Sequence, residues 1–302
     1  MNLGLTGGTG FVGQAVLDQA NARGFSIRAL TRRDQSSRAA VEWIAGDLSS
    51  SDALTDMAQG CDAILHIAGV VNAPDAAGFL EGNVTGTQNV VQAARKAGVS
   101  RLFLVSSLAA REPGLSDYGR SKQLAEEIVR QSGLDWTIIR PPAVYGPRDT
   151  EMLDLFRAAH WRIVPMPPRG RTSIIHVEDL ARLLIDLLQS GPELGERIFE
   201  PDDGKPGGWS HVELARAIGR AVGKPVWVPH IPAALLAGAA RLDRLIRGSK
   251  AKLTPDRARY MVHPDWVVDK KKRVPEELWL PNIVAVEGLS QTAQWYRDAG
   301  WL

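Results

Sequence analysis

The chain has 302 residues, of which 44% are hydrophobic and 23% are charged. This is enough for a large buried core, and for one big domain or two closely associated ones. The formal net charge of +2 is too mild to indicate a nucleic acid or an anionic membrane as partner, and it would suit a small phosphate-bearing molecule. The single cysteine, Cys61, excludes an intrachain disulfide and fits a reducing compartment, so we expect a cytoplasmic protein.

Signals for export or membrane insertion are not expected in this sequence. The first predicted strand starts by Leu3 and leaves no room for a signal peptide, and no apolar run reaches about 18 residues. The longest apolar stretch, residues 231–242, leads into Arg241, Arg244 and Arg247, which recur as on one helix face. A surface helix with its alanine and leucine side packed inward explains this stretch, and a peripheral membrane helix is the alternative.

Short apolar stretches alternate with amphipathic ones through the first half of the chain. The strands that we predict lie at residues 2–6, 26–31, 41–45, 63–67, 101–106 and 136–140, and the helices lie at 11–23, 53–59, 85–97 and 117–131. Such alternation indicates a parallel sheet covered by helices. We therefore predict the α/β class, with a Rossmann-like, doubly wound parallel sheet.

Beyond Pro141 the composition changes, because proline and glycine become frequent and most of the tryptophans lie there. We predict a dinucleotide-binding domain over residues 1–150 and a smaller substrate-binding lobe over residues 151–302. The two are expected to interleave through a returning region at 172–200, where residues 173–176 and 197–200 have the pattern of strands.

A glycine-rich turn directly follows the first predicted strand and fits the pattern Gly-x-x-Gly-x-x-Gly. The cofactor contacts that we predict from it are Gly7, Gly8, Thr9, Gly10, Phe11, Val12 and Gly13. Glycine lets the backbone turn tightly and approach a pyrophosphate closely, and the helix that follows presents free N–H groups to that anion. Because the turn lies between a strand and an amphipathic helix, it predicts a dinucleotide site.

About 20 residues further on, sites that bind NAD usually carry an acidic residue for the ribose hydroxyls. This chain has Thr31, Arg32 and Arg33 there. Arginine cannot accept a hydrogen bond from the ribose, but it can bind a 2′-phosphate through two donors, so we predict NADP(H) in preference to NAD(H). Asp47 and Leu48, after the third strand, are placed to meet the adenine, and Asp47 is also suited to cap the next helix.

Tyr118 and Lys122 are four residues apart, which places them on one face of a predicted helix. An unperturbed tyrosine titrates at about pH 10, and a neighbouring ammonium lowers that pKa by stabilising the phenolate. The tyrosine can then exchange a proton with a substrate oxygen while hydride moves at a nicotinamide. Ser107, which follows an earlier strand, would hydrogen-bond the same oxygen, with Ser106 as the second choice.

With these motifs the chain resembles the extended branch of the short-chain dehydrogenase/reductase superfamily, which comprises NAD(P)-dependent epimerases, dehydratases and reductases. The resemblance covers nearly the whole length and includes residues 66–69, 83–87, 140–147, 176–181 and 295–302, the last being similar to hydroxysteroid dehydrogenases and dihydroflavonol reductases. It implies further cofactor contacts from Ala68, Gly69, Pro141 and Val144, and from Tyr118 and Lys122 themselves. His66 is interpreted as a strand histidine satisfied by backbone groups.

Two departures from the family pattern argue against sugar-nucleotide chemistry. Residues 172–173 are Thr-Ser where such members usually carry Arg-Asp, and residues 108–109 are Leu-Ala where dehydratases carry an acidic pair. The short link from Ser107 to Tyr118 is instead similar to that of atypical members such as the nucleotide-binding accessory subunit of respiratory complex I. Those proteins can bind NADPH without turning it over.

We predict an NADP(H)-dependent oxidoreductase that interconverts a carbonyl and a secondary alcohol. The alternatives are an epimerase that oxidises and re-reduces a sugar, and an NADPH-binding subunit without catalysis. The substrate is expected to lie against residues 70–79, 108–115, 143–148 and 161–168, where apolar side chains indicate either an apolar substrate or ordinary packing. We predict no metal site and no nucleic-acid partner, and the resemblance implies a homodimer.

Overall fold

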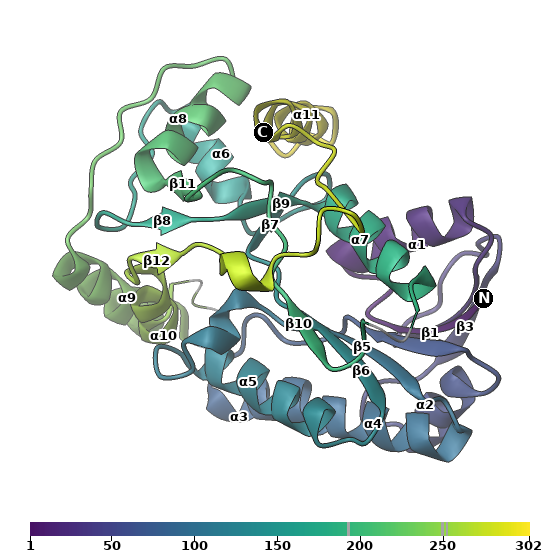
Figure 1. The fold of residues 1–302 in the computed structure, drawn as a ribbon. Coiled ribbons are helices and arrows are strands. Elements are labelled where there is room, and N and C mark those ends of the chain that lie inside the picture. The colour runs from purple at the N-terminus through teal and green to yellow at the C-terminus, as the bar shows by residue number, and fades with distance from the viewer. Residues whose placement is uncertain (192–193, 249–250, 252) are drawn as a thin grey trace. The chain divides into compact units, whose positions relative to one another are not determined.

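The computed structural model describes residues 1–191, 194–248, 251 and 253–302. They form two compact units, one of residues 1–140 with 180–199 and one of residues 141–179 with 200–302 (Figure 1). The strands of the first unit are β1 (Asn2–Thr6), β2 (Ser26–Thr31), β3 (Val41–Ala45), β4 (Ala63–His66), β5 (Arg101–Val105), β6 (Asp135–Ile139) and β10 (Arg197–Phe199). Its helices are α1 (Phe11–Ala22), α2 (Ser51–Ala58), α3 (Ala76–Phe79), η1 (Leu80–Thr85), α4 (Gly86–Ala97), η2 (Leu108–Arg111), α5 (Asp117–Arg130) and most of α7 (Val177–Gln189).

The first unit is built on one seven-stranded sheet in the order β10-β6-β5-β4-β1-β2-β3, and every neighbouring pair is parallel. The chain works outward from β1 in one direction and then in the other, so the sheet is doubly wound with its switch point between β1 and β4. Ligands of such sheets bind outside the carboxyl ends of the strands at that point. The predicted Rossmann-like fold is confirmed.

Helices cover both faces of this sheet, with α2, α4 and α5 on one face and α1 and α7 on the other (Figure 1). The central strands are buried on both sides, and for this reason they consist of nearly continuous apolar residues, as in Ala-Ile-Leu of β4. A core cluster that includes Leu54, Ile64, Val90, Leu102 and Val129 joins α2, α4 and α5 to the strands. This packing fixes the ends of β1, β4 and β5, from which the candidate site residues follow.

The second unit contains two small sheets and a group of helices. Its strands are β7 (Ala143–Tyr145), β8 (Arg171–Thr172), β9 (Ile174–His176), β11 (Trp209–Ser210) and β12 (Asp265–Trp266), and its helices are α6 (Leu153–His160), α8 (His211–Ala221), α9 (Ala233–Arg247), α10 (Pro255–Met261), η5 (Lys270–Lys272) and α11 (Ala285–Asp298). Strand β9 pairs with β7, and β8 lies between β11 and β12. Of the two strand-like segments within residues 172–200, β10 therefore joins the large sheet and β9 does not.

The core of the second unit lies among β7, α6, α8 and α11 and combines aliphatic with aromatic side chains. Phe156 and Tyr296 are fully buried and meet edge to face with ring centroids 5.1 Å apart, and Tyr145 meets His176 in the same manner. A separate small cluster joins α9 to α10 through Leu236, Ala240 and Ala258. Helix α9 is thus attached to the unit mainly by its contact with α10.

Candidate active site

The glycine turn leaves the carboxyl end of β1 at the switch point of the sheet. Gly7 has φ of +80°, and a Cβ placed on it would lie 2.6 Å from the backbone N of Ala68, which follows β4. A Cβ on Gly13 would lie 2.0 Å from the carbonyl oxygen of Gly7. Both positions therefore require glycine for the chain's own packing. The turn and the segment after β4 are in direct contact, as the cofactor assignment needs.

Gly10 differs from these two glycines, because a Cβ there would meet only the Gly7 carbonyl oxygen, at 3.3 Å. Gly10 is exposed and precedes α1 without a side-chain cap. Within the described residues, the N–H groups of Phe11, Val12 and Gly13 have no hydrogen-bond partner. The cradle fits a dinucleotide pyrophosphate: it offers uncapped N–H donors at a helix N-terminus and space where a side chain would intrude.

Arg32 and Arg33 follow β2 and are both exposed. The hydroxyl of Thr31 donates to the Arg33 carbonyl at 2.7 Å, and this bond shapes the turn that carries the two arginines. Arg38, in the same loop, is held by Asp18 at 2.6 Å and by Gln14. Among the described residues, the guanidinium groups of Arg32 and Arg33 have no such partner, so they remain available to an anionic ligand.

Asp47 is positioned by its own loop. One carboxylate oxygen accepts the Ser49 N–H at 2.8 Å and both the Ser49 and Ser50 hydroxyls, and these hydrogen bonds lower the pKa of Asp47. The carbonyl of Leu48 accepts from the Asn89 side chain at 2.8 Å. The hydrogen bonds of the turn that precedes α2 therefore explain the position of the Asp47 side chain. They use one of its carboxylate oxygens and leave the other for a ligand.

His66, the last residue of β4, is buried and belongs to a chain of hydroxyl hydrogen bonds. The Thr87 hydroxyl donates to the Asn83 carbonyl at 2.6 Å, so it accepts from Nε2 of His66 at 3.1 Å. Nδ1 of His66 then accepts from the Thr6 hydroxyl at 2.6 Å, and Thr6 in turn accepts the N–H of Ala68. Burial, with a smaller contribution from the charge of Lys122, lowers the pKa of His66 to about 3, so the ring is neutral.

This chain of hydrogen bonds gives His66 a positioning role, and its partners are hydroxyl groups rather than the backbone groups expected from the sequence. It fixes Ala68 at the switch point. Asn83 extends the same support, because its side chain binds both backbone groups of Val70 and donates to the Ser121 hydroxyl at 2.8 Å. Ser121 donates in turn to the carbonyl of Tyr118. The segment after β4 is thereby connected to the first turn of α5.

Helix α5 presents Tyr118 and Lys122 one turn apart. Ser116 caps the helix by accepting the Gly119 N–H at 2.9 Å, which fixes its first turn. Tyr118 is half-buried, and its ring lies 5.9 Å from that of Phe79. Lys122 is 5% exposed, and its Nζ donates to the carbonyl of Val105, the last residue of β5, at 2.9 Å.

Burial lowers the pKa of Lys122 to about 8, and the charge of Glu126 acts in the opposite direction. The ammonium is therefore the prevailing form at neutral pH, held in a place with little water around it. A cation fixed one helical turn from a phenol favours the phenolate form of that tyrosine. The geometry of α5 can thus support proton transfer at Tyr118.

The two serines after β5 lie in different surroundings. Ser106 is buried, and its hydroxyl donates to Glu126 at 2.5 Å. Ser107 is half-buried, and its hydroxyl accepts the Ala109 N–H at 3.2 Å as the cap of η2, which leaves its own hydrogen available. Ser107 is therefore the serine that can donate to a substrate oxygen.

Glu126 is a residue of this site that the sequence analysis missed. It is fully buried, and its carboxylate binds the guanidinium of Arg140 through two hydrogen bonds of 2.6 and 2.8 Å. The signal was present, because Tyr118, Lys122 and Glu126 recur every fourth residue on one face of α5. Through these hydrogen bonds Glu126 links Ser106 to Arg140.

The remaining predicted contacts lie in the second unit. Pro141 is its first residue, and Val144 is in β7, opposite Ile175 of β9. In the same unit the guanidinium of Arg171, which is adjacent to the missing Arg-Asp pair, donates to the carbonyls of Gly207 and Gly208. Among the described residues there is no His, Cys, Asp or Glu cluster that could hold a metal ion.

Comparison with known proteins identifies the family to which this chain belongs. A family model described as NAD(P)H-binding matches residues 7–190. A ceramide reductase of Caulobacter vibrioides is 36% identical to this chain over an alignment that covers 99% of this chain and 95% of that protein. The chain belongs to the extended short-chain dehydrogenase/reductase superfamily.

Other superfamily members agree with this placement. The 4-hydroxy-2-methyl-3-oxo-4-farnesyl-3,4-dihydroquinoline-1-oxide ketoreductase of Stigmatella aurantiaca is 28% identical, covering 84% of this chain and 89% of that protein. The solved structure of human epimerase family protein SDR39U1 with NADPH matches with a TM-score of 0.75 at 18% identity, covering 97% of this chain and 99% of that one. This structural likeness shows the shared fold. The named relatives support the general interpretation of this superfamily member as an NAD(P)-dependent oxidoreductase.

Proposed function

We propose that this chain reduces a ketone on a ceramide-like lipid to a secondary alcohol, with NADPH as the preferred reductant. The observation that carries the proposal is the identity of 36% with a ceramide reductase along nearly the full length of both proteins. The ketoreductase relative acts on a compound whose name includes a farnesyl group, which supports an apolar substrate. The ring of Phe79 beside Tyr118 supplies an apolar contact next to the phenol.

When bound, NADPH supplies the hydride that adds to the carbonyl carbon. Tyr118 donates its phenolic proton to the carbonyl oxygen, so the C=O group becomes CH–OH. The buried ammonium of Lys122 stabilises the phenolate that Tyr118 leaves behind. Ser107 donates its free hydroxyl hydrogen to the same oxygen and holds it in line with the tyrosine.

The preference for NADPH is proposed from Arg32 and Arg33. Both guanidinium groups are exposed and lack partners within the described part of the chain, whereas Arg38 beside them is paired with Asp18. At the end of β2, where NAD sites usually carry an acidic residue for the ribose, this chain has Thr31, Arg32 and Arg33. Two free cations after β2 suit the additional phosphate of NADPH.

The test is an assay of the purified protein with NADPH and a short-chain ceramide in which the sphingoid hydroxyl is oxidised to a ketone. We expect NADPH to be consumed and the ketone to be reduced to the alcohol in equal amounts, as followed by absorbance and mass spectrometry. Isomerisation of a sugar nucleotide without net NADPH consumption would support the epimerase alternative. NADPH binding without turnover on this lipid or on a panel of ketones would support the non-catalytic alternative.

A further inference from the structure

Helix α9 is the longest helix of the second unit, yet only two of its residues are buried, Leu236 and Ala240. They lie four positions apart and pack against Ala258 of α10 and its neighbours. The inward face of α9 is therefore one narrow stripe. The expected inward packing of the alanine and leucine side holds for Leu236 and Ala240, but the other three leucines of α9 are exposed.

A second apolar face of α9 is exposed. Leu235, Leu242, Leu245 and Ile246 are 64%, 56%, 82% and 72% exposed. At 3.6 residues per turn, Leu235, Leu242 and Ile246 fall within an arc of about 40°, and Leu245 widens this arc to about 100°. A continuous strip of large aliphatic side chains in water is unusual on a soluble protein and marks an interaction surface. We call these four residues the α9 strip.

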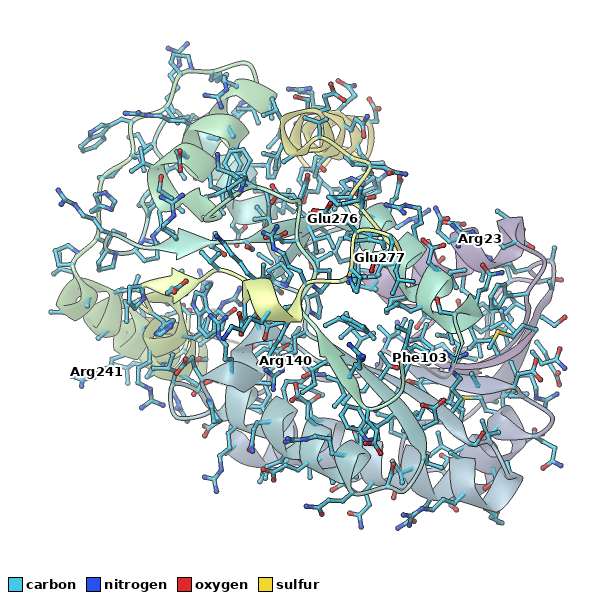
Figure 2. All side chains as sticks on the ribbon, in the orientation of Figure 1. Arg23, Phe103, Arg140, Arg241, Glu276 and Glu277 are labelled. Atoms are coloured by element: carbon cyan, nitrogen blue, oxygen red, sulfur yellow. The ribbon has the colours of Figure 1, made fainter. Side chains whose placement is uncertain are left out.

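Arg241 borders the α9 strip, about 40° around the helix from Leu245, and Arg244 lies about 60° further around the helix. Arg241 and Arg244 are exposed, and in the described part of the chain their guanidinium groups have no hydrogen-bond or ion-pair partner. Arg241 lies on the outer side of the helix (Figure 2). Asp243, the only acid of α9, is bound to Arg247 at 3.2 Å and to the N–H of Leu253. The helix therefore presents aliphatic side chains together with uncompensated positive charge.

We propose that the α9 strip and its arginines bind the surface of an anionic lipid bilayer. Leucine and isoleucine side chains enter the boundary between head groups and acyl chains, Arg241 extends from the edge of the strip to the lipid phosphates, and Arg244 adds positive charge to the same helix. A second copy of the chain is a poorer partner, since a pair of such strips would bring the same arginines together. The three arginines and one aspartate of α9 give this helix a formal charge of +2, as large as the net charge of the whole protein.

The helix lies along the membrane and does not cross it. At 1.5 Å per residue its 15 residues span roughly 22 Å, less than the hydrocarbon thickness of about 30 Å. Within the described residues, no helix combines the length and apolar character required for a membrane span. Attachment of this kind would give the protein access to a substrate held in a bilayer. The inference rests on α9 alone and goes beyond the proposed function, which an unattached enzyme could also perform.

The test is co-sedimentation of the full-length protein with vesicles of phosphatidylcholine, with and without phosphatidylglycerol. We expect binding to the anionic vesicles, weakened by salt, and at least about tenfold weaker binding for the L242E/I246E variant, because burial of one such side chain alone is worth about this factor. R241E/R244E should lose the preference for anionic vesicles. Val286→Glu, which changes a 42% exposed residue in the first turn of α11, is the matched control and should bind as the wild type does.

Binding of L242E/I246E equal to that of the wild type, or no binding of the wild type to anionic vesicles, would overturn the proposal. So would light scattering that shows a wild-type dimer and a monomeric L242E/I246E variant, since the strip would then be an interface between copies. Melting temperatures and NADPH binding in solution show that each variant is folded. Reduction of a short-chain keto-ceramide without vesicles tests the proposed function separately, because α9 is not required for it.

Discussion

Ser106 and Ser107 are neighbours with different surroundings, and this difference separates a structural hydroxyl from one that can serve a substrate. Ser107→Ala removes the free donor, so we expect a fall in kcat of about 100-fold, as for the loss of one oxyanion donor, with little change in melting temperature. Ser106→Ala removes a donor to the buried Glu126, so it should mainly lower the melting temperature. Steady-state kinetics and thermal denaturation of both variants decide the assignment, and a reversed pattern would contradict it.

The arginines after β2 provide a second contrast at the scale of single residues. R32A/R33A removes both free guanidinium groups, so we expect NADPH affinity to fall about tenfold or more while NADH affinity changes little. Arg38→Ala is the control, because Arg38 is already bound to Asp18 and should not discriminate between the two nucleotides. Titration by fluorescence or calorimetry measures both affinities. Equal weakening of NADPH and NADH would refute the assignment to the 2′-phosphate.

At the scale of the element, helix α5 carries both the buried cation Lys122 and the proposed proton donor Tyr118. Burial lowers the pKa of Lys122 to about 8, and Tyr118 needs the protonated amine. We therefore expect kcat/KM for reduction to be full below this pKa and to fall as the pH rises through about 8. A profile that stays level to the pKa of an ordinary lysine would contradict this role.

The lowered pKa of Lys122 makes stability rise over the pH range in which activity is expected to fall. Loss of activity can therefore be distinguished from unfolding at alkaline pH. The folded-state pKa of Lys122 lies below the unfolded value of 10.5, so between these values the unfolded chain binds more protons. The contribution of Lys122 to the free energy of unfolding therefore rises with pH across that window. Urea denaturation along the pH series should show no loss of stability attributable to Lys122 where activity declines.

In the glycine turn before α1, Gly13 is required by the fold, whereas Gly10 is expected to be required by the nucleotide. Gly13→Ala would force a Cβ to 2.0 Å from the Gly7 carbonyl, so we expect a strongly destabilised or unfolded protein. Gly10→Ala would meet only that carbonyl at 3.3 Å, so the melting temperature should change little while nucleotide affinity falls. Thermal denaturation and nucleotide titration of the two variants test this. Unaltered nucleotide binding in Gly10→Ala would show that the pyrophosphate does not approach the turn.

The strands of the first unit and its helices α1, α2, α4 and α5 were predicted from the sequence to within two residues, whereas α3, η1, η2 and α7 were not predicted. Strands buried on both faces are continuous apolar runs, and helices that cover a sheet have one apolar face, so both patterns are local. The candidate site residues were predicted in the same way, because the glycine turn and the Tyr118–Lys122 spacing are also local. Whether these side chains act as proposed stays a prediction.

The partners of the site residues could not be predicted, since they come from distant parts of the sequence. The hydroxyl chain through Thr6, His66 and Thr87 spans three elements, and no single segment reveals it. The choice between Ser106 and Ser107 depended in the same way on Glu126, which is 20 residues away. The inward packing expected for α9 holds for only part of its apolar residues, because composition does not say which apolar face of a helix is covered.

At the scale of the whole molecule, the two compact units are held together by different kinds of structure. The first is held by one parallel sheet whose pattern is repeated, and the second by short strands and helices around a core of aliphatic and aromatic side chains. Because residues 180–199, with β10, return to the first unit between residues 141–179 and 200–302 of the second, neither unit is continuous in sequence. The two cannot therefore be separated by one cut in the chain, and activity should be studied with the full-length protein.

The central claim is that Tyr118 protonates a lipid ketone as the carbonyl carbon receives hydride from NADPH. Mass spectrometry of the product formed from keto-ceramide and NADPH deuterated at the transferring position tests it most directly. We expect one deuterium on the carbinol carbon of each product molecule. In Tyr118→Phe, which should still bind NADPH, we expect the rate to fall by about 100-fold or more. Product without deuterium, or an undiminished rate in Tyr118→Phe, would contradict the claim.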